Sequence, residues 1–158
     1  MKKIYSSLLI FLLGFIALSC SEDKDPIYND ADAVASKLTS INDTYVLDAA
    51  NADFATFSYS AASFGLDVSF MYSLEASLMS DFEDFKELGS SSSAKEGLVV
   101  TADKMNSILL NWDVEPETPT KVYFRVKAYV QDLSSKPTKM FTYSNVISSS
   151  ISAYSGEK

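Results

Sequence analysis

The sequence predicts a single antiparallel β-sandwich with one short helix. Two stretches alternate apolar and polar residues with a period of two, Val68–Leu78 and Val122–Val130. Shorter stretches of the same kind are separated by polar breaks, and a chain of 158 residues has room for one domain of ordinary size. Hydrophobic residues make up 47% of the chain, which is enough for a packed core. Short alternating strands that follow one another directly are typical of an antiparallel sandwich.

Each of the two clear strands has one apolar and one polar face. In the first, Phe70 and Leu74 lie on the expected inner face, and Glu75 lies with several serines on the outer face. In the second, the expected outer face carries Tyr123, Arg125, Lys127 and Tyr129. This alternation indicates strands that are half-buried. Weaker strands are expected at Leu38–Ile41, Phe54–Ser60, Phe82–Leu88, Gly97–Ala102 and Asn145–Tyr154.

One segment between the strands has helical spacing instead. Apolar residues fall at i, i+3, i+4 and i+7, namely Met105, Ile108, Leu109 and Trp112. Either Thr101 or Asp103 could cap the start of this helix. The small and polar run Gly89–Ser93, with the two residues that follow it, is expected to be a flexible loop.

The first residues have the pattern of a secretory signal peptide. Two lysines after Met1 are followed by an apolar run from Ile4 to Leu18, which is a basic region and then a short apolar region. A membrane-spanning helix needs about 20 apolar residues, a length that this run reaches only with its serines included. We therefore expect a signal peptide at residues 1–19, an acidic tether at 20–36 and one sandwich domain at 37–158.

The only cysteine of the chain follows the apolar run directly. Ala17-Leu18-Ser19-Cys20 resembles the relaxed lipobox of Bacteroidetes lipoproteins, in which the cysteine is acylated and becomes the new N-terminus. Acyl chains would anchor the protein to a bilayer, because each buried methylene contributes roughly 0.8 kcal/mol. An acidic cluster after such a cysteine resembles the signal that exports lipoproteins to the outer face of the outer membrane. Its residues here, which could also be a simple charged tether, are Ser21, Glu22, Asp23, Lys24 and Asp25.

The composition excludes several classes of function. The chain has no histidine and one cysteine, so it cannot form a Ser-His-Asp triad, a Cys-His pair, an intrachain disulfide or a multi-cysteine metal cluster. Its net charge of −8 would repel phosphate backbones. We therefore expect no nucleic-acid partner, no metal and no cofactor. A binding or scaffolding module, or an enzyme that uses only carboxylates, remains open.

Several segments resemble known β-sandwich proteins. The segment VEPETPTKVYFRVKAYV at Val114–Val130 looks like the E–F corner and F strand of fibronectin type III domains. FATFSY at Phe54–Tyr59 would be strand B, with Tyr59 where such domains usually carry a core tryptophan. A narrower resemblance is to the N-terminal domain of the SusE family of Bacteroidetes outer-membrane lipoproteins. The features that carry it, in this order, are FSYSAASFG, VSFMYSLEAS, the helix Asp103–Asn111, FRVKAYV and SNVISSSISAY.

The SusE resemblance spans Lys37 to Tyr154 and implies an immunoglobulin-like or fibronectin-III-like sandwich on the cell surface. SusE proteins sit beside a SusC-like TonB-dependent transporter and a SusD-like glycan-binding lipoprotein, and they bind polysaccharides. Their glycan sites look to be on further C-terminal domains, whereas this chain stops at Lys158. The resemblance therefore implies an accessory subunit, not an enzyme, that acts by protein interaction or spacing. Direct binding of a polysaccharide is the alternative.

Exposed aromatic side chains are the first candidates for contact with a glycan or a partner. Trp112 is the only tryptophan, and its helical register favours a place in the core or at its lid. Tyr123, Arg125 and Tyr129 are expected on one outer face, where such rows more often cover a sheet. The acidic segment 81–87 could offer oxygen ligands to calcium or paired carboxylates for glycoside hydrolysis. Because it has no calcium-loop pattern and a small sandwich offers no shelter, solvated side chains are the favoured interpretation.

Overall fold

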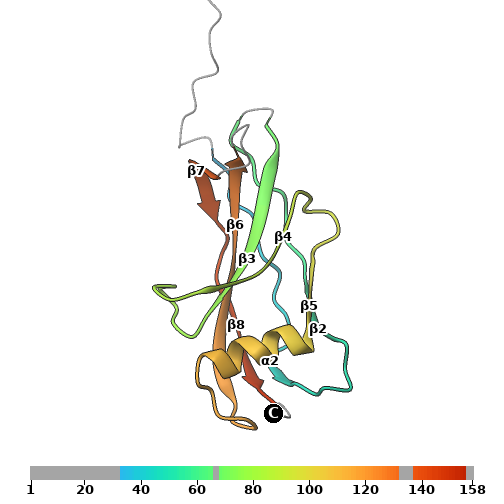
Figure 1. The fold of residues 1–158 in the computed structure, drawn as a ribbon. Helices are drawn as coiled ribbons and strands as arrows, with labels where there is room; N and C mark the ends of the chain where they lie inside the picture. The colour runs from blue at the N-terminus through green and yellow to red at the C-terminus, as the bar shows by residue number, and fades with distance from the viewer. Residues whose placement is uncertain (1–32, 66–67, 132–136, 156–158) are drawn as a thin grey trace, which may run out of the picture.

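The computed structural model describes residues 33–65, 68–131 and 137–155, which form two β-sheets and one helix (Figure 1). The helix lies at one end of the sheets, near the last described residues. The first described residues lie at the opposite end. The elements, in chain order, are β1 (Thr44–Val46), β2 (Asp53–Phe57), β3 (Phe70–Ser77), β4 (Lys86–Ser91), β5 (Leu98–Thr101), α2 (Ala102–Asn111), β6 (Thr120–Gln131), β7 (Pro137–Tyr143) and β8 (Ile147–Ser152).

The larger sheet is built around β6. Its strand order is β1-β8-β6-β3-β4, and β7 pairs with β6 along the same edge as β8 does. Along one edge β6 pairs with β3, from Phe70 opposite Val130 to Ser77 opposite Tyr123. Along its other edge β6 pairs first with β8 and then with β7. Among the strands that the structure describes, only β1 and β8 pair in parallel.

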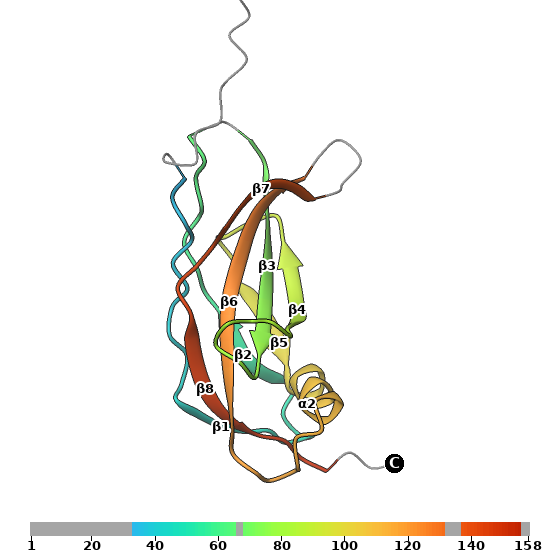
Figure 2. The ribbon, with the colours of Figure 1, turned by 90° about the vertical axis from the view of Figure 1, so that its left-hand side faces the viewer.

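The smaller sheet consists of β2 and β5, and the N-terminal segment extends it. Val34 forms an antiparallel bridge with Ser63, and Leu38 forms one with Tyr59. The chain then leaves this sheet and reaches the larger one, where β1 lies beside β8. One segment thus joins both sheets, which holds the two layers of the sandwich together (Figure 2).

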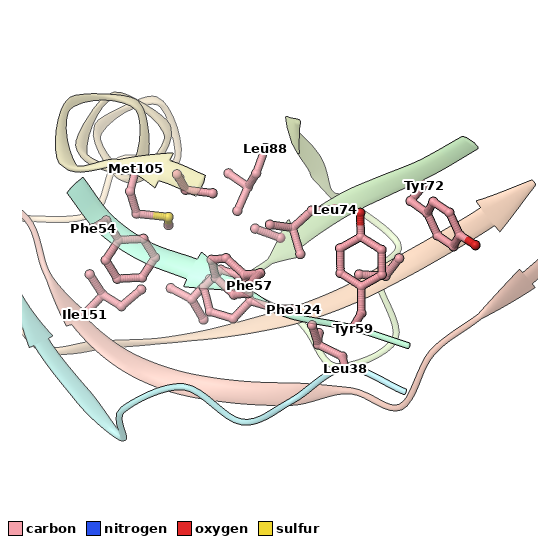
Figure 3. Close-up of a cluster of buried hydrophobic side chains, with 14 of the residues drawn as sticks. Leu38, Phe54, Phe57, Tyr59, Tyr72, Leu74, Leu88, Met105, Phe124 and Ile151 are labelled. Carbon is pink, nitrogen blue, oxygen red and sulfur yellow. The ribbon is translucent and has the colours of Figure 1, made fainter. Parts of the chain in front are cut away.

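The core lies between the two sheets and under the helix (Figure 3). The rings of Phe57 from β2 and Phe124 from β6 are fully buried, and their centroids are 5.0 Å apart. Met105 and Leu109 of α2 close the core at one end. The helix has the predicted spacing, and Thr101 is its N-cap because its hydroxyl accepts a hydrogen bond from the backbone N–H of Lys104.

The structure confirms the all-β sandwich and both clear strands, but it shows that one predicted outer face is wrong. Ser73, Glu75 and Ser77 were expected to face solvent, yet each is at most 4% exposed. A loop that follows β3 covers this face. The alternation of polar and apolar residues separates the two faces of a strand, but it does not predict that another segment buries the polar face.

The weaker strands are only partly as predicted. The expected strand Phe82–Leu88 begins later, at Lys86, and continues to Ser91, so Gly89 belongs to β4 and not to a loop. Leu38–Ile41 is not a strand, because only Leu38 makes a bridge. Strands β1 and β7 were not predicted. Both are edge strands of the sheet, where a mixed pattern of polar and apolar residues is tolerated.

A side chain joins the N-terminal segment to the bend between β7 and β8. The Asn145 amide donates a hydrogen bond to the Leu38 carbonyl (3.0 Å) and accepts one from the Leu38 N–H (2.8 Å). Leu38 is 2% exposed, so its backbone groups would have no easy substitute partner.

We expect Asn145→Ala to lower the free energy of unfolding by roughly 1–3 kcal/mol, because it leaves buried backbone groups unsatisfied. Urea unfolding followed by tryptophan fluorescence measures this change. Asn111→Ala, at the exposed end of the helix, is the matched control and should change stability by no more than about 0.5 kcal/mol. Equal losses in the two variants would contradict the proposed role of Asn145.

The stability of the fold should also decrease at alkaline pH. Burial raises the pKa of the Tyr59 phenol, and the neighbouring Tyr72 adds to this effect. Because the pKa of Tyr59 is higher in the folded chain, its contribution to the free energy of unfolding is complete below the pKa of the unfolded chain, about 10. This contribution is lost as the pH rises through the pKa of the folded state. We expect the urea midpoint of unfolding to be constant from pH 7 to about 9 and to fall above about pH 10. Tyr59→Phe should weaken that fall, and an unchanged alkaline profile would show that Tyr59 does not contribute to it.

Candidate interaction surface

The outer face of the larger sheet brings together most of the predicted contact residues. Tyr123, Arg125, Lys127 and Tyr129 alternate along β6 with side chains that are fully buried on the inner face, as predicted. All four are half-buried and not freely exposed. Tyr123 lies between β3 and β8, whereas Lys127 and Tyr129 lie between β3 and β7.

Arg125 is held by four neighbours, of which the Phe85 ring is the most distant, with its centre 5.8 Å from the guanidinium. Its Nε donates a hydrogen bond to Glu75 Oε2 at 2.7 Å, and the side chains of the pair are 15% and 3% exposed. The guanidinium lies over the Tyr143 ring at 3.9 Å and over the Phe82 ring at 4.1 Å. Arg125 is therefore a structural centre of this face and has little surface left for a ligand.

The loop between β3 and β4 covers the same face. It crosses over the sheet at β6, as Figure 2 shows, and it places Phe82 over Arg125. The buried Ser77 hydroxyl donates a hydrogen bond to the Asp84 carbonyl (2.6 Å) and accepts one from the Met79 N–H (3.0 Å). Phe82 has a φ of 59°, a strained value for a bulky residue, and is 4% exposed. Burial of its ring offsets that strain.

Next to this loop is a cluster of rings and ammonium groups that we call the β7 patch. The patch consists of Lys127, Tyr129, Lys139, Phe141 and Tyr143. Phe141 is 45% exposed and Tyr143 is 36% exposed. The Lys127 ammonium lies 4.9 Å from the centre of the Phe141 ring and 5.7 Å from that of Tyr129. Lys139 shares the outer face because it alternates with Phe141 and Tyr143 along β7.

The sequence prediction found only part of this patch. Tyr129 followed from the period-two pattern of β6. Lys139, Phe141 and Tyr143 were missed because β7 itself was not predicted. Their alternation in the segment PTKMFTY is the signal that could have revealed them.

The other predicted contact residues lie apart from the β7 patch. Tyr123 is near the other end of β6, with the Lys121 ammonium 5.2 Å from its ring centre. Trp112 is the C-cap of α2 and packs half-buried against the core, where it lines a small pocket with Leu78, Met79 and Asp84. The structure therefore does not bring Trp112 together with the tyrosines.

The acidic segment is divided between the loop and β4. Asp81, Glu83, Asp84 and Glu87 are all exposed. Within the described part of the chain, no three side chains of the metal-binding types come together. Cys20 and the cluster Ser21–Asp25 lie outside the described residues.

A groove that the sequence did not reveal lies beside the start of β3. The half-buried ring of Phe70 lines it together with Ser93, Ala94 and Lys95. An aromatic ring beside hydroxyl and ammonium groups can contact a sugar or another small polar ligand.

Comparison with protein families gives one match. The model of the family described as SusE outer membrane protein matches residues 21–127. The chain belongs to the SusE outer membrane protein family. This membership assigns the protein to the outer membrane and to the Sus system. Curated proteins and solved structures gave no match.

The SusE match ends at Lys127, in the middle of β6. Most of the β7 patch therefore lies beyond the matched residues, and its properties are not carried over from the family. Among the described residues, no helix is long and apolar enough to cross a membrane.

Proposed function

We propose that this protein is a lipid-anchored accessory subunit of a polysaccharide-uptake complex, and that it binds or spaces its protein partners. The expected partners are a SusC-like TonB-dependent transporter and a SusD-like lipoprotein. Membership of the SusE family carries this proposal. Support comes from the outer face of the larger sheet, where exposed aromatic residues lie beside cations. Aromatic residues are enriched in protein interfaces.

The anchor in this proposal is Cys20, facing the cell exterior. The family match begins at Ser21, directly after that cysteine, which is consistent with a mature chain that starts at Cys20. From Cys20 the chain could extend at most about 45 Å before it reaches Ala33. The first described residues and α2 lie at opposite ends of the sandwich (Figure 1). With this arrangement, the helix end would point away from the membrane, as suits a spacer.

We expect Cys20→Ala to release the protein from the membrane fraction, because the variant has no residue that can be acylated. Fractionation of cells followed by immunoblotting, with metabolic labelling by a fatty acid, measures the effect. Ser19→Ala keeps the cysteine and should remain labelled and membrane-bound. Persistent membrane association of Cys20→Ala would disprove the lipid anchor.

Co-purification tests the partner interaction itself. The tagged full chain, extracted from outer membranes in mild detergent, should recover a SusC-like or SusD-like subunit identified by mass spectrometry. Recovery of neither subunit, under conditions that keep such complexes intact, would contradict an accessory role.

Direct binding of a polysaccharide is the second candidate function, and the groove beside Phe70 favours it. Affinity electrophoresis in gels that contain starch, dextran or levan tests this alternative. Retardation that Phe70→Ala abolishes would support it, whereas equal mobility in all gels would leave it without support. We propose binding and not catalysis, because Asp81, Glu83, Asp84 and Glu87 are exposed, whereas a catalytic acid needs a sheltered environment that raises its pKa.

A further inference from the structure

We propose that the β7 patch is the docking surface for an acidic, extended segment of a protein partner. This inference rests on the proposed function, which supplies the existence of a protein partner, and it adds the surface and the chemistry that would recognise it. The argument depends on three features of the patch: its charge, its exposed rings and its free strand edge.

The first feature is charge. The whole chain carries −8, yet Lys127 and Lys139 lie on one small area of its surface. In the part of the chain that the structure describes, neither lysine forms an ion pair, and the pairs that do form are Glu75 with Arg125 and Asp84 with Lys86. An ammonium group over a ring still has N–H donors for an incoming carboxylate. Complementary charge therefore favours an acidic partner.

The second feature is exposed aromatic surface. Phe141 and Tyr143 remain 45% and 36% exposed although their ring centroids are only 5.5 Å apart. The rings are held in place, because Arg125 lies against Tyr143 and Lys127 lies against Phe141. Preorganised aromatic side chains lose little conformational entropy on binding and are common anchors in interfaces.

The third feature distinguishes a protein partner from a lipid surface. β7 pairs with β6 on one side, and among the described residues no strand pairs with its other side. An edge of this kind offers backbone N–H and C=O groups to another extended chain. Lipid headgroups could satisfy the lysines but could not continue the ladder of backbone hydrogen bonds. An acidic segment in extended conformation satisfies both the charges and the edge.

Photo-crosslinking in the native outer membrane tests this inference. The full chain carries p-benzoylphenylalanine in place of Phe141, and a matched control carries it in place of Val99, which is 56% exposed on the other sheet. We expect Phe141 to crosslink to a protein peptide rich in Asp and Glu, and Val99 to give no such product. Lys127→Glu with Lys139→Glu should reduce the crosslink at least about tenfold through charge repulsion. Lys127→Arg with Lys139→Arg should retain it.

Three outcomes would overturn the inference: crosslinks to lipid or lipopolysaccharide, a protein crosslink that charge reversal does not change, or no more product from Phe141 than from Val99. Thermal unfolding of each variant shows whether it is folded. The proposed function is judged separately by co-purification of the unmodified protein. A subunit that still co-purifies while the Phe141 crosslink is absent would place the interface elsewhere and leave the accessory role intact.

Discussion

Glu75→Ala is expected to lower the free energy of unfolding by about 3–5 kcal/mol, because it leaves the Arg125 guanidinium without its anion in a largely buried site. The Glu75 side chain is 3% exposed, and its carboxylate accepts the 2.7 Å hydrogen bond from Arg125. The same guanidinium supports the rings of Phe82 and Tyr143. Loss of the pair should therefore also loosen the loop that covers the sheet and the neighbouring β7 patch.

Urea unfolding of the wild type and four variants, namely Glu75→Ala, Arg125→Ala, their combination and Glu87→Ala, measures this effect. Glu87→Ala is the matched control, because Glu87 lies opposite Glu75 on β4 but is exposed. It should change stability by no more than about 0.5 kcal/mol. The double variant Glu75→Ala with Arg125→Ala should lose less than the sum of the two single variants, since no unpaired charge remains. Similar losses for Glu75→Ala and Glu87→Ala would show that the ion pair has no special importance.

Phe124→Ala should lower the free energy of unfolding by about 3–5 kcal/mol through loss of buried surface and the cavity that remains. Phe124 is fully buried in β6, with its ring 5.0 Å from that of Phe57 and 6.4 Å from that of Phe54. These rings come from both sheets, so the cavity would open at the contact between the two layers (Figure 3). A loss of this size is a large part of the stability of an ordinary domain.

Two further variants keep the test of Phe124 informative if Phe124→Ala does not fold. Phe124→Leu keeps most of the apolar volume and should lose less stability than Phe124→Ala. Tyr123→Ala removes the neighbouring ring from the half-buried outer face and should also lose less. Urea midpoints that fall as much for Tyr123→Ala as for Phe124→Ala would contradict a core that is centred between the sheets.

Local patterns in the sequence determined the fold class and its most regular elements. The period-two alternation of β3 and β6 and the helical spacing of α2 need only a few neighbouring residues, so they are readable without the rest of the chain. The same alternation correctly placed Tyr123, Arg125 and Tyr129 on an outer face. The family resemblance stated from short segments was confirmed by the SusE match.

Only the tertiary structure decided how far that outer face is exposed and which residues contact it. Alternation distinguishes two faces of a strand, but whether the polar face is solvated depends on segments distant along the chain. Here the loop after β3 and the edge strand β7 bring Phe82 and Tyr143 onto Arg125, so Glu75 is buried as its partner. Long-range pairing of β7 likewise placed Lys139 and Phe141 beside Lys127. Local alternation can indicate that a segment is a strand, but it does not predict which strand the segment pairs with. That pairing depends on the packing of the whole fold.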